Sequence, residues 1–418
     1  MSNRVKTTQL VHGDRRLNKP QNGAVHEPSN NSVLFEFDDV SELEAVFQGK
    51  QAGHVYSRSS SGSAVALQNM LSDLEGGAGA VVFSTGMAAI SAMMFSLLKA
   101  GDHIVVSQFL FGNTRSFMQT LGNFDIDVSF VDVTQANNVQ NAMQDNTKMV
   151  FCESIANPVT QVADLSGISE VCAQNEALFV IDNTMTPASM LDAKSFGASI
   201  VVSSLTKYIG GHGNVLGGVL VDLGNFDWCC FDNISDIYKV SNTAQWGLTQ
   251  IRKRGLRDMG GTLAPQSCHQ LSVGLETLNM RMHKTCSNAL ALAQFCEAQN
   301  AIKRVHYPGL SNHPHHERAR EQFSEQYGGI LSIELMDRID MRAFINAMSL
   351  IICSTHLGDT RTLILPAATT IFHENGPQQR AAMGIDDMLI RISVGIEDIE
   401  DLLGDITQAL NIAESQDS

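Results

Sequence analysis

The sequence predicts an α/β fold, with a large domain on a mostly parallel sheet followed by a smaller α+β domain. Short apolar runs alternate with helical patterns through the first part of the chain, as is typical of βαβ units. Two of these runs, residues 178–181 and 199–202, are β-branched and bounded by turn residues, which indicates strands buried on both faces. The chain has 418 residues, more than one small core needs, so two domains are expected.

Composition narrows the class of protein. The formal net charge of -16 favours a soluble protein and argues against binding to nucleic acid or an anionic membrane. No apolar run approaches the roughly 20 residues of a membrane-spanning helix, and residues 1–4 lack the apolar core of a signal peptide. The 8 cysteines are scattered without a CxxC pair, so we expect reduced thiols in a cytoplasmic protein.

Residues 1–54 are expected to form an N-terminal arm rather than a domain. They are polar and show little sustained periodicity, although residues 41–47 have the pattern of a short capped helix. The arm is either a free tail or a segment that wraps a neighbouring subunit. An α/β domain is expected over residues 55–256, and an α+β domain over residues 257–418.

The remaining elements are predicted from apolar periodicity and turn residues. In the large domain we expect helices at 65–74 and 88–98, and further strands at 80–83, 103–107, 128–131 and 149–153. Residues 223–254 have the composition of an irregular, aromatic-containing insertion. In the second domain we expect a helix-rich segment at 271–298, strands at 330–335 and 389–394, and closing helices.

Two predicted strands lead into side chains that suit one cofactor. Asp182 follows the first strand, and Lys207 lies shortly after the second, beside hydroxyl groups. Ligands of parallel sheets bind beyond the carboxyl ends of the strands, so both side chains are expected in one crevice. A lysine that forms a Schiff base and an acid that partners a pyridinium nitrogen are what pyridoxal phosphate needs. The alternative is a solvated lysine and a helix-capping aspartate.

A phosphate cradle is predicted at Ser84-Thr85-Gly86-Met87, between the strand at 80–83 and the helix at 88–98. Glycine lets backbone N–H groups approach an anion, and a helix N-terminus favours negative charge. A plain helix cap is the alternative interpretation.

The chain also resembles the Cys/Met-metabolism family of pyridoxal-phosphate enzymes, which includes cystathionine γ-synthase, the γ- and β-lyases and the O-acylhomoserine sulfhydrylases. The resemblance runs from about residue 35 to the C-terminus, and its specificity lies in the ordered set of motifs. These are Tyr56-Ser57-Arg58, Ser84-Thr85-Gly86-Met87-Ala88-Ala89-Ile90, Glu153-Ser154 with Asn157-Pro158, Asp182-Asn183-Thr184, Ser204 to His212, Tyr307-Pro308-Gly309-Leu310, Leu357-Gly358-Asp359 and Arg391 to Gly395. The resemblance implies the fold-type I PLP-dependent transferase fold.

The resemblance implies a role for each site residue. Lys207 is the catalytic residue, which carries the cofactor and moves protons, while Asp182 keeps the pyridine nitrogen protonated. Arg391 clamps the substrate carboxylate, a task suited to a bidentate donor. The implied cofactor-binding residues are Tyr56, Arg58, Gly86, Met87, Phe111, Asn157, Asp182, Ser204, Thr206 and Lys207, and the implied substrate-binding residues are Arg391 and Tyr56. Tyr56 and Arg58 reach the neighbouring subunit's phosphate, which implies a homodimer with shared sites and commonly a homotetramer.

Five departures from the family pattern bear on the substrate. They are Ser61 to Ser63 in place of Asn-Pro-Thr, Phe111 where lyases commonly have tyrosine, Ile371 in place of histidine, His356 where lyases often have serine, and an insertion around Trp246 that is longer than the usual connection. Phenylalanine stacks on a cofactor ring but cannot supply a proton, which a leaving thiolate needs more than a leaving carboxylate. The insertion near Trp246 is another potential proton source.

The favoured function is therefore γ-replacement on an O-acylhomoserine by sulfide or a small thiol, in the trans-sulfuration reactions of sulfur amino-acid metabolism. A methionine or cystathionine γ-lyase, which releases 2-oxobutanoate and ammonia, is the alternative. A non-catalytic PLP-binding paralogue is an alternative of another class. His313, His315 and His316 could suggest a metal site, but the surrounding prolines and the family's His-Pro-x-His pattern favour a surface turn, so no metal is expected.

Overall fold

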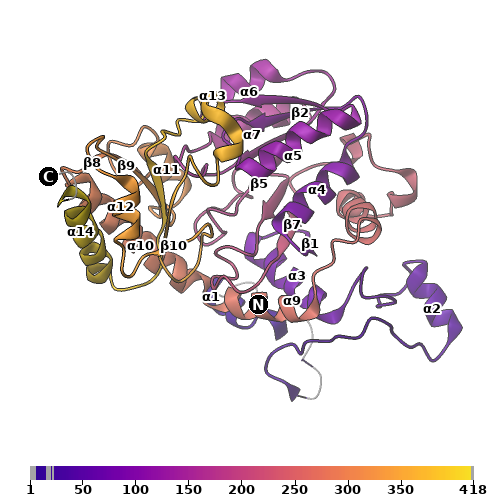
Figure 1. Cartoon of the computed structure of the whole chain (residues 1–418). Helices are drawn as coiled ribbons and strands as arrows, with labels where there is room; N and C mark the ends of the chain where they lie inside the picture. Colours follow the sequence, from indigo (N-terminus) through magenta and orange to yellow (C-terminus); the bar gives the residue numbers. More distant parts are fainter. Residues whose placement is uncertain (1–5, 16–19, 21–22, 416–418) are drawn as a thin grey trace.

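The computed structural model of the chain describes residues 6–15, 20 and 23–415. Residues 1–4, where the sequence lacks the core of a signal peptide, lie outside the described residues. The chain builds two sheets, one of seven strands and one of five, each flanked by helices (Figure 1). Among the described helices, each is too short or too polar to cross a membrane.

The described secondary structure is as follows. The strands are β1 (Gly79–Phe83), β2 (His103–Ser107), β3 (Asp127–Val131), β4 (Thr147–Glu153), β5 (Leu178–Asp182), β6 (Ile200–Ser203), β7 (Gly218–Asp222), β8 (Ile302–His306), β9 (Ile330–Leu335), β10 (Ile352–Cys353), β11 (Leu363–Pro366) and β12 (Leu389–Ser393). The α-helices are α1 (Lys6–Val11), α2 (Val40–Phe47), α3 (Gly62–Glu75), α4 (Gly86–Leu97), α5 (Gly112–Thr120), α6 (Ala136–Ala142), α7 (Leu165–Gln174), α8 (Trp246–Gln250), α9 (Pro265–Glu276), α10 (Leu278–Glu297), α11 (His316–Gln322), α12 (Met341–Asn346), α13 (Gly376–Ala382) and α14 (Ile399–Ser415). Short 3-10 helices are η1 (Gly13–Arg15), η3 (Leu121–Phe124), η4 (Trp228–Cys230), η5 (Asp236–Tyr238), η6 (Thr243–Gln245) and η8 (His373–Asn375), and η7 (Ile251–Asp258) is a π-helix.

The larger sheet has the strand order β1-β7-β6-β5-β4-β2-β3. Strands β2 to β6 pair in parallel, whereas β7 is antiparallel to both of its neighbours. Successive side chains of β1 point to opposite faces of the sheet. Ala80 and Val82 pack with α3 on one face, and Val81 and Phe83 pack with α4 on the other. Helices thus cover both faces, and the strands are buried as the sequence predicts for a mostly parallel sheet.

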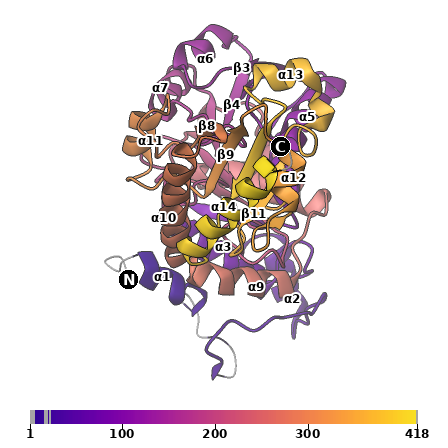
Figure 2. The ribbon, with the colours of Figure 1, turned by 60° about the vertical axis from the view of Figure 1, so that its left-hand side comes forward.

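The smaller sheet has the order β10-β11-β12-β9-β8, with mostly antiparallel pairing. Helices α10, α12 and α14 pack together beside it (Figure 2). Its central strand β12 is fully buried, and its third residue is Arg391. A charged side chain is therefore held on the most protected strand of this domain.

Two segments differ from the compact domains. Helix α2 stands away from the rest of the chain in Figure 1, and none of its residues is buried. The predicted insertion is irregular up to residue 245, where Trp228 is buried against Phe226 and Phe231. Its last part is wrongly predicted, because residues 246–258 form α8 and η7, whose Ile251 packs in the core with α4.

Candidate active site

A cavity of about 340 Å³ lies beyond the carboxyl ends of β4, β5 and β6. It is closed by the N-terminal turn of α4 and by residues of the smaller domain. The lining residues are Thr85, Gly86, Met87, Ile90, Phe111, Asn113, Thr114, Glu153, Asn157, Asp182, Thr184, Met185, Val202, Ser204, Thr206, Lys207, Leu216, Thr355, Leu357 and Arg391. Every predicted site residue except Tyr56 and Arg58 is in this set, so the structure brings distant motifs together.

Two buried carboxyl groups form one wall of the cavity. Glu153 ends β4 and Asp182 ends β5, and the two residues pair directly across the parallel strands. Burial beside Asp182 raises the pKa of Glu153 to about 8. Burial also raises the pKa of Asp182, but the backbone N–H of Thr184 donates to its Oδ1 at 3.0 Å and opposes that rise. Glu153 therefore keeps its proton near neutral pH, whereas the hydrogen bonds from Thr184 favour the charged form of Asp182.

The turn before α4 is packed tightly enough to require glycine. A Cβ at Gly86 would lie 2.9 Å from the Cβ of Ser204, closer than side chains tolerate. The Thr85 side chain caps the helix by accepting from the N–H of Ala88 at 3.0 Å. The backbone N–H groups of Gly86 and Met87 have no partner within the helix, because they belong to its first turn. The helix start, the glycine and Ser204 thus lie together where the sequence predicts an anion cradle.

The hydroxyl groups beside Lys207 are partly engaged with the backbone. Thr206 Oγ1 accepts from the N–H of Gly217 at 3.0 Å, and the N–H of Ser204 donates to Thr184 Oγ1 at 2.8 Å. These bonds fix the turn that follows β6. This chain reversal holds Lys207 at the wall of the cavity.

The amine of Lys207 contacts a histidine from the smaller domain. Lys207 Nζ lies 3.3 Å from His356 Nδ1. Burial and the nearby guanidinium of Arg391 lower the pKa of Lys207 to about 8. Burial and the charge of Lys207 lower the pKa of His356 to about 4, so this imidazole is neutral near pH 7. At neutral pH the pair is an ammonium that donates to a neutral imidazole.

Arg391 is a buried cation without a carboxylate partner among the described residues. It is 1% exposed, and its Nη2 donates to the carbonyl oxygens of Thr355 at 3.0 Å and His356 at 2.8 Å. Its Nε is buried and has no protein partner in the described chain. Burial lowers the pKa of this guanidinium to about 10. An anionic ligand in the cavity would satisfy these remaining donors.

Asn157 also presents an unsatisfied group. Its loop is closed by the bridge between Ile155 and Val162, and the bond from Asn157 to Pro158 is cis. Asn157 Oδ1 is buried and accepts no hydrogen bond in the described chain. The ring of Phe111 packs edge-on against Phe372 at 5.9 Å, and the N–H of Phe111 donates to Glu153 Oε1 at 2.8 Å.

Tyr56 and Arg58 lie outside the cavity. Tyr56 is 42% exposed, and the guanidinium carbon of Arg58 lies 5.5 Å from the centroid of its ring. Arg58 Nη1 donates to the backbone oxygen of Arg257. Neither side chain lines the cavity of its own chain, so the structure leaves their role in a neighbouring subunit's site as a prediction.

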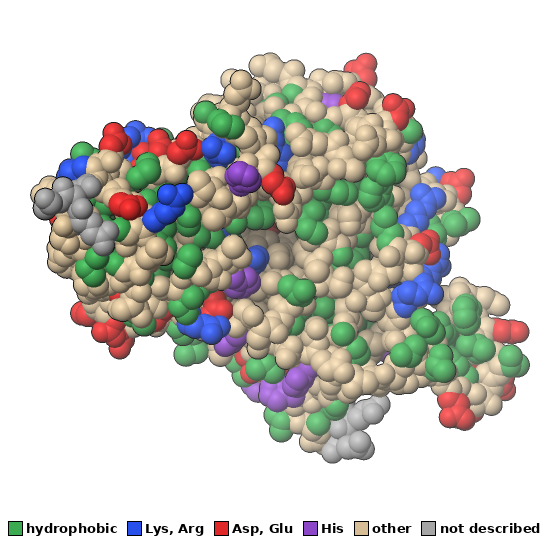
Figure 3. Space-filling view, in the orientation of Figure 1, with side chains coloured by type: hydrophobic (Ala, Val, Ile, Leu, Met, Phe, Trp, Pro, Cys, Tyr) green, Lys and Arg blue, Asp and Glu red, His purple; other side chains and the backbone are tan. Residues whose placement is uncertain are grey.

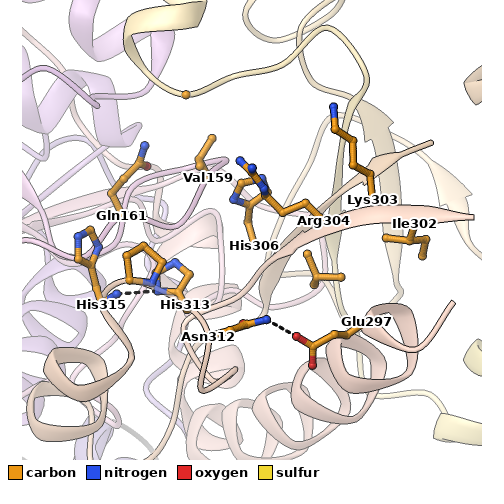
Figure 4. Close-up of a pocket in the computed structure, with 13 residues that line it drawn as sticks. Val159, Gln161, Glu297, Ile302, Lys303, Arg304, His306, Asn312, His313 and His315 are labelled. Carbon is orange, nitrogen blue, oxygen red and sulfur yellow. Dashed lines mark hydrogen bonds between the residues drawn. The ribbon is translucent and has the colours of Figure 1, made fainter. Parts of the chain in front are cut away.

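The histidine turn after β8 is used for packing. His313 Nε2 lies 3.4 Å from Thr160 Oγ1, and the N–H of Val162 donates to His315 Nδ1 at 3.2 Å. These histidines line a second cavity of about 560 Å³, shown in Figure 4, which also contains Val159 and Gln161 from the loop of Asn157. Burial lowers the pKa of His313 to about 3. The described chain contains no group of three or more His, Cys, Asp or Glu placed to hold a metal ion.

The active-site cavity fits pyridoxal phosphate on its own chemistry. It combines an anion cradle at α4, a carboxylate at Asp182, an amine at Lys207 and an unsatisfied acceptor at Asn157. Comparison with known proteins decides the family, since residues 7–411 match the one described as "Cys/Met metabolism PLP-dependent enzyme".

This chain belongs to the Cys/Met-metabolism PLP-dependent enzyme family. The family resemblance, the fold class and the cofactor predicted from sequence are thereby confirmed. An L-methionine gamma-lyase of Fusobacterium nucleatum subsp. polymorphum is 36% identical over 392 residues, covering 93% of this chain and 94% of that protein. An O-acetyl-L-homoserine sulfhydrylase of Corynebacterium glutamicum is 34% identical over 417 residues, covering 96% of this chain and 95% of that protein.

Solved structures of family members share the whole fold. A putative O-acetylhomoserine (thiol)-lyase from Campylobacter jejuni, solved with N'-pyridoxyl-lysine-5'-monophosphate, gives a TM-score of 0.91 at 29% identity. The similarity covers 97% of this chain and 99% of that one. The chain is thus a PLP-dependent enzyme of the trans-sulfuration family, whose members include both sulfhydrylases and γ-lyases.

Sequence reasoning missed two members of the site. Glu153 was noted only as part of a motif, although it ends its strand as Asp182 does, and that shared position was the available signal. His356 was noted only as a departure from the family pattern, because its contact with Lys207 joins segments of different domains. Trp246, the other potential proton source, does not line the cavity, and its Nε1 donates to the oxygen of Val240 at 2.7 Å.

Proposed function

We propose that this enzyme replaces the acyloxy group of an O-acylhomoserine with sulfide or a small thiol. Pyridoxal phosphate, when bound, supplies an electron sink that makes the hydrogens of the substrate carbons acidic. Lys207 carries the cofactor covalently and, as a free amine, moves protons between substrate carbons. Asp182 holds the pyridine nitrogen protonated.

Two different sets of donors would hold the anionic parts of the cofactor and of the substrate. The N-terminus of α4, with Gly86, Met87 and Ser204, holds the phosphate, and Thr206 adds a hydroxyl. Arg391 clamps the substrate α-carboxylate, which its buried position and unsatisfied Nε support. Asn157 would contact the phenolic oxygen of the cofactor ring, and Phe111 would stack on that ring.

Phe111 is the observation that carries the choice of leaving group. The titratable side chains that line the described cavity are Glu153, Asp182, Lys207 and Arg391, and Phe111 adds no hydroxyl to them. A thiol has a pKa of about 8.5, so a departing thiolate benefits from a proton donor. A carboxylate with a pKa of about 4 departs without one. A site with few proton donors therefore favours the ester substrate.

A methionine or cystathionine γ-lyase is the second candidate. The observation in its favour is the 36% identity to the L-methionine gamma-lyase of Fusobacterium nucleatum subsp. polymorphum. In that reaction Lys207 or Glu153, the lining groups that hold a proton near neutral pH with a pKa of about 8, would have to protonate the departing sulfur. The non-catalytic alternative is wrong for a chain of this enzyme family.

Steady-state kinetics on four substrates separate the two candidates. O-acetylhomoserine, O-succinylhomoserine, cystathionine and methionine are compared with and without sulfide, and both homocysteine and 2-oxobutanoate are measured. We expect the highest kcat/KM with an acyl ester, and homocysteine as the main product when sulfide is present. If methionine or cystathionine gives the highest kcat/KM, the leaving-group argument is wrong and the enzyme is a γ-lyase.

We further propose a homodimer in which Tyr56 and Arg58 complete the neighbouring subunit's site, and a tetramer of two such dimers. The exposed position of both side chains, outside the cavity of their own chain, supports this arrangement. The arm that precedes them carries apolar side chains on its surface, as Figure 3 shows at its lower right. Phe35, Phe37 and Phe47 line a shallow groove there.

A further inference from the structure

The starting observation is the surroundings of the Lys207 amine. Its one side-chain hydrogen-bond partner in the described chain is His356, with 3.3 Å between Nζ and Nδ1. The guanidinium of Arg391, another cation, acts on this amine and lowers its pKa. Among the described residues no carboxylate forms an ion pair with this amine, so its orientation depends on the neutral acceptor.

The backbone around His356 is fixed by packing. Its carbonyl oxygen accepts from Arg391 Nη2 at 2.8 Å, and the N–H of Gly358 donates to Ser393 Oγ at 3.0 Å. Gly358 has φ 75°, and a Cβ there would lie 2.9 Å from the carbonyl carbon of Lys207. The segment that carries His356 therefore lies directly against the backbone of Lys207, which leaves the imidazole little freedom.

The charges that face the imidazole are Lys207, Arg391, Arg361 and Asp359. Asp359 is already bound by Arg361, with 2.8 Å from Nε to Oδ1 and 2.9 Å from Nη2 to Oδ2. Cations therefore outnumber the one neutralised carboxylate, and burial adds to their effect in lowering the pKa of His356 to about 4. Nδ1 is then free to accept a hydrogen bond throughout the neutral range, and the proton sits on Nε2.

We propose that His356 is the positioning residue of Lys207: its Nδ1 holds the free amine and sets the proton affinity of that amine. An amine that donates to Nδ1 directs its remaining bonds and lone pair away from the imidazole, toward the cavity. The acceptor also stabilises the ammonium form, and so raises the pH at which Lys207 becomes a base. The consequence for catalysis rests on the function proposed above, whereas the pairing itself does not.

Two variants of matched shape test the pairing. In His356→Asn the amide oxygen replaces Nδ1 as acceptor, whereas His356→Leu has the same shape without an acceptor. The readout is competitive acylation of lysines in the full chain freed of cofactor, measured by mass spectrometry across pH. The midpoint is the pH at which a lysine reaches half of its maximal acylation rate. We expect the midpoint of Lys207 to fall by about one to two pH units in His356→Leu, and to stay within about half a unit in His356→Asn.

Lys239 provides an internal control, because it lies on the surface beside Asp236 and its midpoint should be the same in all three proteins. Circular dichroism establishes that each variant is folded, and His356→Met replaces His356→Leu if the latter does not fold. Equal midpoints for Lys207 in the wild type and the apolar variant would overturn the proposal.

The cofactor-loaded enzyme gives a second readout. We expect kcat to fall about 10- to 100-fold in His356→Leu, with partial recovery in His356→Asn. KM should change less than about 2-fold, because Arg391 bonds to the backbone oxygen of residue 356, which every variant keeps. A shifted midpoint in a protein inactive on every acyl ester would reject the proposed function alone. Normal sulfhydrylase activity with unshifted midpoints would reject the role of His356 alone.

Discussion

At the scale of single residues, the site is defined by charges that lack their usual partners. Within the part of the chain that the structure describes, Arg391 is buried without a carboxylate partner, and the Lys207 amine contacts a neutral imidazole. An isolated buried charge is costly, so such groups are retained where a ligand completes them. Each of them carries a role in the proposed function, and Lys207 offers the sharpest test.

Replacement of Lys207 by alanine should abolish the covalent link to the cofactor. We expect Lys207→Ala to bind pyridoxal phosphate without the yellow absorbance of the wild type, and kcat to fall by at least about 10³-fold. Borohydride reduction followed by peptide mass spectrometry locates the link in the wild type. Lys239→Ala, which removes an exposed lysine, should keep both colour and activity. A reducible link and normal turnover in Lys207→Ala would show that another lysine carries the cofactor.

Some site residues could be predicted from the sequence, but several of their contacts could not. Lys207 and Asp182 could be found because each follows an apolar run that ends at the ligand-binding edge of a parallel sheet. The unsatisfied state of Arg391 and the contact of His356 could not, because both depend on how the two domains meet. Phe111 was identified from its motif, but its contact with Phe372 joins two distant loops.

At the scale of elements, helix α4 begins where the sequence predicts an anion cradle. Its first residue, Gly86, packs against Ser204, which follows β6. This contact joins the start of α4 to the turn that carries Lys207, so one tight packing contact sets the distance between the proposed phosphate site and the lysine. A larger residue at this point would move them apart.

Gly86→Ala should weaken cofactor binding. The added Cβ would lie 2.9 Å from Ser204 Cβ and 3.2 Å from its Cα, and the backbone must shift to accommodate it. Overpacking of this kind costs about 1–3 kcal/mol, so Kd for pyridoxal phosphate should rise about 5- to 100-fold. Gly404→Ala in α14 is the matched control, because a Cβ there meets nothing within 4 Å. The control should keep Kd and gain about 1 kcal/mol of stability. An unchanged Kd in Gly86→Ala, measured by fluorescence titration, would contradict the cradle.

Most elements were predictable because their patterns are strong. The predicted strands of the large sheet occupy the observed places, with ends that differ by about two residues at most. Strands β8, β10 and β11 were missed: β8 carries the exposed Lys303 and Arg304, and both residues of β10 are exposed. Strand β7 was missed as well, since it begins directly at the glycines 217 and 218. Edge strands with little apolar alternation give a weak signal.

At the scale of the whole molecule, the arm and the exposed Tyr56 and Arg58 point to a neighbouring subunit. Among the residues of α2, Val40 is 69% exposed and Phe47 is 70% exposed. Apolar side chains grouped in this way mark an interaction surface more often than a solvated one. In a two-fold dimer, each subunit would offer the same residues to the other.

Complementation tests the shared site. Arg58→Ala and Lys207→Ala are each expected to be inactive, and co-expression should restore about a quarter of wild-type activity, because half of the dimers are mixed and each has one intact site. Two differently tagged chains allow the mixed dimer to be isolated. Mixed dimers that form but remain inactive would show that Arg58 serves its own chain.

The antiparallel strand β7 has a consequence for synthesis of the protein. Strand β1 lies at the edge of the described sheet, and its one strand neighbour there is β7, whose residues 218–222 are translated much later. Until β7 emerges from the ribosome, the apolar run of β1 has an unpaired edge, a state prone to aggregation. Helix α4 follows β1 directly, so the anion-binding turn takes its final place only after the lysine-bearing turn has been made. The two halves of this turn pair are therefore completed together, once about the first half of the chain has been translated.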